Sequence, residues 1–130
     1  MPTDTDVPRF PRTGDDYRLA AMSAYLVALI EQTGDRHWST TDYRPTFERL
    51  MEKYGGSMMA AALLEQVEGV PLDEKAAAIW QFPTAAAARS FWNDPEYQAV
   101  VPLRQPLGRF QIFILPGLDE APWSPSDPDE

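Results

Sequence analysis

The chain has 130 residues, a net charge of −9 at pH 7 and no cysteine, which excludes a disulfide framework and a thiol nucleophile. An acidic surface of mixed sign argues against nucleic-acid binding, because a phosphate backbone requires a basic stripe on the protein.

The two ends of the chain differ in composition from its middle. Residues 1–16 hold four aspartates and three prolines, and residues 119–130 hold five acidic residues, three prolines and no lysine or arginine. Such segments cannot bury enough apolar surface to offset the entropy of ordering them. We therefore predict a flexible N-terminal extension and a flexible acidic tail around one domain, residues 17–118, with one modest core.

The longest apolar run, Leu19–Ile30, is interrupted by Ser23 and is too short to span a bilayer. Four aspartates precede it where a signal peptide needs a basic flank. We therefore expect a cytoplasmic protein with no membrane partner.

The first predicted element, Ser23–Ile30, is ambiguous between helix and strand. Its alanines and leucines favour a helix, whereas a continuous apolar run of this length is typical of a strand buried on both faces. We assign a strand, because the later strands would otherwise form an unpaired three-strand remnant. A helix follows, capped by Thr41 or Asp42, with Pro45 in its first turn and a stop at Gly55-Gly56.

Turn residues and helix caps divide the second half of the domain. Ser57–Leu64 is a weak strand candidate because Met and Ala are not strong strand formers, and the acidic segment Glu65–Glu74 is predicted to be a loop. The remaining elements are strand Ala76–Phe82, helix Ala85–Trp92 capped by Thr84, a short helix begun by Asp94-Pro95, and strand Phe110–Leu115.

The predicted order, β-α-β-β-α-β, is that of an α+β, ferredoxin-like domain with an antiparallel sheet. The third and last strands carry apolar residues on both faces, whereas a sheet with one solvated face alternates apolar and polar residues. The helices can cover only one face, which leaves on the order of 400 Å² of mostly apolar sheet uncovered. We therefore predict a homodimer in which two sheets face each other and enclose a barrel-like interior.

Four short motifs give the chain a resemblance to a known family. They are Tyr54-Gly55-Gly56, Phe82-Pro83-Thr84, Asp94-Pro95-Glu96-Tyr97-Gln98 and Pro102-Leu103-Arg104. In this combination the chain resembles a family of uncharacterised domains in the dimeric α/β-barrel superfamily, which reads YGG, E-F-P-S, S-P-E-Y-Q and P-L-R. The resemblance covers residues 23–117 and implies a ferredoxin-like protomer and a sheet-to-sheet dimer, with no established chemistry.

The wider superfamily includes cofactor-free monooxygenases, isomerases and cyclases, and some heme enzymes. This chain departs from the family pattern at Gln81, where relatives carry a glutamate, and at the bulky Trp80 before it. The lost carboxylate puts an acid/base role at that position in doubt, and Trp80 indicates a reshaped interior.

The sequence offers little to hold a metal or a nucleotide. One histidine and no cysteine cannot build a usual zinc site, so we predict no metal site and no cofactor. His37 is either a solvent-exposed residue of a loop or, as the alternative, a heme ligand. The only adjacent glycines, Gly55-Gly56, are explained as a helix stop, and no phosphate-binding loop is present.

Polar and aromatic residues of the strands, helices and loops are the candidates for a site. The predicted catalytic residues are Tyr25, His37 and Gln81, and the predicted substrate-binding residues are Trp38, Trp80, Trp92, Arg104, Gln111 and Phe113. A buried amide needs a partner, so Gln81 and Gln111 either pair within the dimer interface or contact a ligand. Arg104 either binds a substrate carboxylate or complements the negative end of its helix. One sequence leaves open which strand face lines the interior.

The composition and the resemblance support two functional hypotheses of different classes. The first is a small cofactor-independent enzyme, of monooxygenase, cyclase or isomerase type, acting on a hydrophobic aromatic or polyketide-like molecule in each protomer's cavity. Such a site works by shape, exclusion of water and hydrogen bonds to a substrate oxygen. The second is a non-catalytic, dimeric small-molecule-binding or accessory protein, which the lack of a nucleophile, a metal site and an obvious acid/base pair favours.

Overall fold

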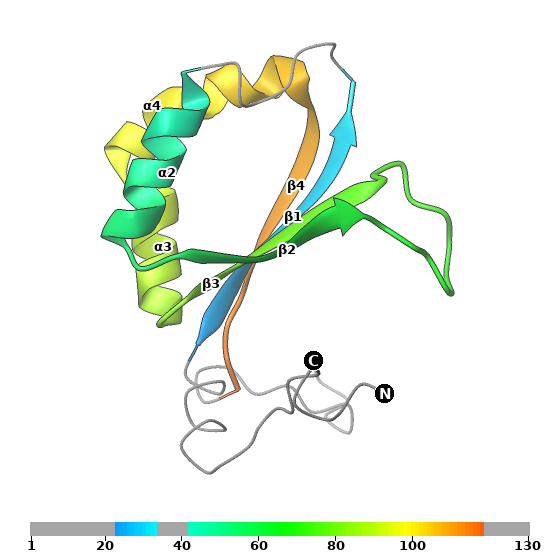
Figure 1. Ribbon diagram of the computed structural model, residues 1–130, viewed down its shortest axis with the longest axis horizontal. Helices are drawn as coiled ribbons and strands as arrows, with labels where there is room; N and C mark the ends of the chain where they lie inside the picture. Colours follow the sequence, from blue (N-terminus) through cyan, green and yellow to red (C-terminus); the bar gives the residue numbers. More distant parts are fainter. Residues whose placement is uncertain (1–22, 34–41, 119–130) are drawn as a thin grey trace, which may run out of the picture.

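A computed structural model describes residues 23–33 and 42–118, which form an α+β fold with one four-stranded antiparallel sheet. Its elements are β1 (Ala24–Gln32), α2 (Tyr43–Lys53), β2 (Ser57–Leu63), β3 (Ala76–Phe82), α3 (Ala85–Asn93), α4 (Pro95–Arg104), the 3₁₀ turn η3 (Gln105–Leu107) and β4 (Gly108–Leu115). The strands lie in the order β2-β3-β1-β4, and the three α-helices of the described residues lie on one side of the sheet (Figure 1). This is the predicted ferredoxin-like arrangement.

The first strand, β1, lies in the centre of the sheet. It pairs antiparallel with β3 on one side and with β4 on the other, so that Leu26 lies opposite both Trp80 and Ile114. Ala24, Leu26 and Ala28 are buried under the helices. Pairing on both sides and burial of an apolar face explain why β1 is a strand although its residues favour a helix. The strand prediction is confirmed, and β1 continues beyond Ile30 to Gln32.

Two helices begin at the predicted caps. Thr84 Oγ1 accepts a hydrogen bond from the backbone N–H of Ala87 at 3.0 Å, at the start of α3. Asp94 Oδ1 accepts one from the N–H of Glu96 at 2.8 Å, and Pro95 follows as the first residue of α4. Both side chains satisfy an N–H group that a helix start leaves without an internal partner.

The start of α2 differs from the predicted cap. Asp42 occupies the N-cap position with helical backbone angles, and its side chain makes no capping hydrogen bond. Thr41, the other predicted cap, lies outside the described residues. The predicted stop at the glycine pair is confirmed, because the backbone of Gly55 has a φ of 78°, in the left-handed region that ends helices.

The hydrophobic core lies between the sheet and the helices and is built largely of aromatic rings. Phe91 of α3 is fully buried, and its ring centroid lies between 4.6 and 5.7 Å from those of Phe47, Phe82 and Tyr97. Each such ring pair contributes about 0.5–1.5 kcal/mol beyond the burial of its area. The ring cluster therefore joins α2, α3 and α4 to β3.

The other face of the sheet is not covered by any described helix (Figure 1). Phe113 and Leu115 of β4 are 49% and 57% exposed on this face. All residues of the edge strand β2 are exposed, and its pairing with β3 shifts in register between Met58 and Ala60. The described residues thus present apolar surface both on the open sheet face and along β2.

The predicted N-terminal extension and acidic tail, residues 1–16 and 119–130, lie outside the described residues. Among the helices of the described residues, none has both the length and the apolar character needed to cross a membrane.

Candidate functional site

The antiparallel register sorts the strand residues onto two faces. Opposite residues share a face, so Leu26 and Trp80 lie on the helix-covered side, while Tyr25 and Gln81 lie on the open side. On β4, Phe113 lies opposite Val27 and belongs to the open side. The register therefore separates the predicted site residues into two groups, one on the helix-covered face and one on the open face.

A cavity of about 340 Å³ lies between the helix-covered face of the sheet and the helices α2 and α4; we call it the main cavity. Its walls include Leu26 of β1, Phe47 of α2, Trp80 of β3 and Ile112 of β4. Met58, Ala61 and Leu63 of the exposed strand β2 line its remaining side. The main cavity is therefore largely apolar, and the residues that form its β2 side are exposed.

The lining residues with polar side-chain atoms are Gln32, Tyr43, Trp80, Tyr97 and Arg104. Three of them lie together: the hydroxyls of Tyr43 and Tyr97 are 3.0 Å apart, and the Arg104 guanidinium is close enough to oppose the rise in the pKa of Tyr43. We call Tyr43, Tyr97 and Arg104 the polar end of the main cavity. It joins the start of α2 to both ends of α4.

The polar end is itself buried. Tyr43, Tyr97 and Arg104 are 6%, 2% and 8% exposed. Burial raises the pKa of Tyr43 far above its ordinary value, and the neighbouring Tyr97 raises it further, although the Arg104 guanidinium opposes the shift. The Tyr43 hydroxyl therefore stays protonated at any physiological pH, so it can donate or accept a hydrogen bond but cannot act as a base.

Arg104 also borders a second cavity, of about 320 Å³, on the side of Trp92. Phe110 and Ile112 line both cavities, and the Arg104 guanidinium carbon lies 4.7 Å from the centroid of the Phe110 ring. Of the predicted substrate-binding residues, Trp80, Trp92 and Arg104 therefore lie at these two adjoining cavities.

The other described candidates lie on the open face and away from the main cavity. Gln81 Nε2 donates a 2.8 Å hydrogen bond to Ser23 Oγ, and Gln111 Nε2 donates a 2.5 Å hydrogen bond to Glu74 Oε2. The bond from Gln111 lowers the pKa of Glu74, which is 9% exposed. Both amides have hydrogen-bond partners within the protomer, whereas the sequence predicted either pairing in the dimer interface or contact with a ligand.

Tyr25 of β1 and Phe113 of the neighbouring strand β4 lie on the same open face, and neither lines the main cavity or the second cavity. His37 and Trp38 lie outside the described residues. The roles predicted for Tyr25, His37 and Gln81 in catalysis stay predictions.

Tyr43 and Tyr97 were not predicted as site residues from the sequence. Both are buried on their helices, and the hydroxyl at the end of each ring was the signal for a polar partner. Their contact spans 54 residues of sequence, so helix periodicity alone could not pair them.

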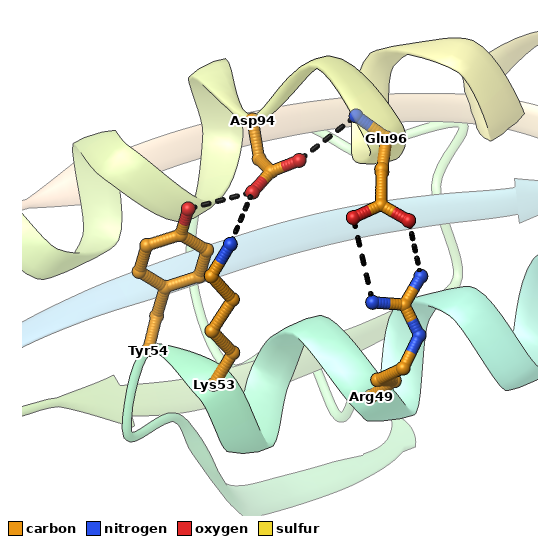
Figure 2. Close-up of polar contacts among 5 residues, drawn as sticks. All are labelled: Arg49, Lys53, Tyr54, Asp94 and Glu96. Carbon is orange, nitrogen blue, oxygen red and sulfur yellow. Dashed lines mark hydrogen bonds and ion pairs between the residues drawn. The ribbon is translucent and has the colours of Figure 1, made fainter.

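A separate polar cluster lies on the outside of the helices, where residues of the motifs meet (Figure 2). The Tyr54 hydroxyl donates a 2.6 Å hydrogen bond to Asp94 Oδ2, and Lys53 Nζ lies 3.3 Å from the same oxygen. Arg49 pairs with Glu96 at 2.6 Å, with both side chains more than half exposed. None of these residues lines either cavity, so this cluster joins helices and does not form part of the candidate site.

Within residues 23–33 and 42–118, no group of three or more histidine or acidic side chains is arranged to hold a metal ion.

Comparison with known proteins places the fold but not the chemistry. Residues 23–118 match the DUF1330 family, described as a domain of unknown function, and no curated protein sequence matches the chain. A protein of unknown function from Rhodopseudomonas palustris is similar over 86% of this chain and 98% of its own, with 18% identity and a TM-score of 0.51. SnoaB, a cofactor-independent oxygenase from Streptomyces nogalater, is 14% identical over 82% of this chain and 100% of its own, with a TM-score of 0.46. A hydroxynitrile lyase from Passiflora edulis is 10% identical over 74% of this chain and 94% of its own, with a TM-score of 0.49.

Proposed function

Because the chain belongs to the DUF1330 family, a domain of unknown function, we propose its function from the geometry of the main cavity. The protein binds a hydrophobic, aromatic or polyketide-like small molecule between the sheet and the helices, and transforms it without a cofactor. The observation that carries this proposal is a cavity of about 340 Å³ with apolar walls and its buried polar groups concentrated at one end.

The size and lining of the main cavity support binding of a small apolar molecule. Small-molecule sites usually measure roughly 300–1,000 Å³ and combine apolar walls with a few placed polar groups. Trp80, Phe47 and Phe110 supply aromatic surface against which a planar ligand can pack. A molecule of modest size, such as one with two fused rings, fits this description better than an extended chain.

The polar end supports chemistry in which negative charge develops on an oxygen of the bound molecule. The Arg104 guanidinium and the hydroxyls of Tyr43 and Tyr97 are hydrogen-bond donors held in a site that is largely shielded from water. Fixed donors of this kind stabilise an enolate or another oxyanion, which is an intermediate type in isomerisation and cyclisation. The polar end is therefore suited to stabilising negative charge on an oxygen of the bound molecule.

Non-catalytic binding is the second candidate function. It is favoured by the composition of the cavity lining, since the described lining residues include no carboxylate and no histidine that could accept a proton. A protein that binds or carries a small molecule needs the apolar cavity and the polar end, but no general base.

Native mass spectrometry of freshly purified protein, followed by identification of any released molecule, tests both candidates. We expect a retained or added hydrophobic compound to bind wild-type protein and to bind Trp80→Leu more weakly. Incubation of the released compound with excess protein then separates the candidates, because an enzyme converts it and a binding protein returns it unchanged. Absence of binding by any planar hydrophobic compound would contradict both.

We also propose that the protein acts as a homodimer, with the open sheet faces of two copies packed together. The open face carries Val27, Ile79, Phe113 and Leu115, all at least partly exposed in the single chain. A second copy is the favoured occupant because at least partly exposed apolar side chains of three neighbouring strands share this face, and continuous apolar patches on proteins usually mark an interface.

The mass of the protein in solution tests this assembly. Light scattering should give about twice the 14.7 kDa of one chain for wild-type protein, and a mass close to 14.7 kDa for Phe113→Lys. Leu103→Lys is the matched control, because Leu103 is similarly exposed, at 42%, but lies on α4 at the other side of the sheet. A wild-type mass near 14.7 kDa at micromolar concentration would contradict the homodimer.

A further inference from the structure

Arg104, in the last turn of α4, is a buried cation that lines the main cavity. Only 8% of its surface is exposed, and its Nε has no hydrogen-bond partner among the described residues. The ion pairs of residues 23–33 and 42–118 involve other cations, such as Arg44, Arg49 and Arg109, whose side chains are 48–72% exposed. Buried charges are normally paired, so the state of Arg104 needs an explanation.

The contacts around Arg104 offset its charge only in part. One face of the guanidinium lies over the Phe110 ring, with 4.7 Å between the guanidinium carbon and the ring centroid. The Tyr43 hydroxyl lies close enough to interact with its charge, and the carbonyl end of α4 adds a favourable partial charge. All of these partners are neutral, and the N–H at Nε remains unused.

Resting on the proposed function of the main cavity, we propose that its ligand is a hydrophobic monocarboxylate whose carboxylate binds Arg104 at the polar end. The planar guanidinium presents paired N–H groups that match the two oxygens of a carboxylate, and burial strengthens such a bond. Tyr43 and Tyr97 supply neutral hydroxyls beside the same position. The apolar part of the ligand lies against Trp80 and the walls of the main cavity.

The lining also argues against other head groups. A phosphate carries up to two negative charges, and the described lining offers one cation, so the second charge would be buried without compensation. A neutral alcohol or amide would leave the charge of Arg104 without a counter-ion. A single carboxylate matches the charge of the polar end.

Calorimetric titration of the wild-type protein with two matched probes tests this inference. 2-Naphthoate and 2-naphthalenemethanol share the same fused rings and differ in charge at the head group. We expect naphthoate to bind at least about tenfold more tightly, as one charged hydrogen-bonded contact implies. Equal affinity for the two probes would overturn the carboxylate inference and leave the proposed binding function standing, whereas no binding of either would overturn both.

Variants then assign the preference to Arg104. In Arg104→Leu the affinity for naphthoate should fall by about tenfold or more, while the affinity for the alcohol changes by no more than about threefold. Arg109→Leu is the matched control, because Arg109 lies on the adjoining strand β4 with an exposed side chain facing away from the main cavity, and both affinities should be unchanged. A loss in Arg109→Leu equal to that in Arg104→Leu would overturn the assignment. If Arg104→Leu does not fold, Arg104→Lys and the two-probe comparison on wild-type protein still decide the question.

Discussion

The hydroxyl of Tyr54 lies 2.6 Å from Asp94 Oδ2, and this bond joins the end of α2 to the junction of α3 and α4 (Figure 2). Asp94 also caps α4 through the N–H of Glu96, and Lys53 Nζ lies 3.3 Å from its carboxylate. The Asp94 side chain is only 5% exposed, although the Lys53 side chain is half exposed. The Asp94 carboxylate thus connects α2, α3 and α4 on the outside of the domain.

Removing the Tyr54 hydroxyl should make stability less dependent on pH in the acid range. The hydrogen bond from Tyr54 is the main cause that lowers the pKa of Asp94. A carboxyl whose pKa is depressed on folding adds stability above its unfolded pKa of about 3.9, and that stability is lost as the pH falls through the folded value. Tyr54→Phe should therefore lower the free energy of unfolding at neutral pH, and the difference from wild type should shrink below about pH 4.

Urea unfolding of wild type and Tyr54→Phe at about pH 7 and about pH 3 measures this effect. Glu48→Gln is the control, because it breaks the exposed pair between Arg44 and Glu48, which contributes little at either pH. A difference between wild type and Tyr54→Phe that is equal at both pH values would show that the hydroxyl does not act through the ionised Asp94.

The cap of α3 offers a local test. Thr84 Oγ1 accepts the hydrogen bond from Ala87 N, so Thr84→Ala leaves that N–H without its partner. The free energy of unfolding should fall by about 1 kcal/mol. Thr84→Ser keeps the hydroxyl and should lose much less, and equal losses in the two variants by urea unfolding would show that the hydroxyl is not what stabilises the start of α3.

Gly108 should be intolerant of a side chain because of its contact with β1. It begins β4 opposite Gln32, and a Cβ at this position would collide with the backbone oxygen of Glu31. A backbone atom in a central strand cannot move aside cheaply, so Gly108→Ala should destabilise the protein by about 1–3 kcal/mol. Arg109→Ala, at the next residue, removes an ion pair to Glu31 in which the Arg109 side chain is 72% exposed, and should change the free energy of unfolding by less than about 1 kcal/mol, measured by the same urea titration. Equal losses would contradict the steric explanation.

Local sequence signals predicted most of the elements of the fold. The caps Thr84 and Asp94 and the stop at Gly55 depend on a few neighbouring residues, and they lie where the sequence predicted them. The strand β1 was predicted from the requirement for a complete sheet and not from its own residues, whose propensity points to a helix. The cap at Asp42 was not confirmed, because its backbone is already helical and its side chain makes no capping hydrogen bond.

The candidate site was less predictable, because its polar end depends on contacts between distant residues. Arg104 lies near the end of a short helix, where the helix dipole favours an arginine whether it is exposed or buried. Only the packing of β4 and α2 shows that Arg104 is buried. Tyr43 and Tyr97 meet across 54 residues. Alternation along a strand fixes which residues share a face, but it does not say which face the helices cover.

The neighbours Trp80 and Gln81 test that assignment of faces. Trp80 lines the main cavity and packs against Phe47 with ring centroids 5.4 Å apart, whereas Gln81 lies on the open face and bonds to Ser23. Trp80→Leu should weaken binding of 2-naphthalenemethanol by about tenfold, because an aromatic contact with a buried ligand is removed. The mass of this variant in solution should be unchanged. Gln81→Leu preserves size and removes the amide, and it should change that affinity by no more than about twofold, a range that corresponds to a few tenths of a kcal/mol. Calorimetry and light scattering on the two variants, after thermal unfolding has shown that both are folded, provide the measurements. If Gln81→Leu weakened binding as strongly as Trp80→Leu, the ligand would lie on the open face, and the catalytic role predicted for Gln81 from the sequence would be favoured over the main cavity.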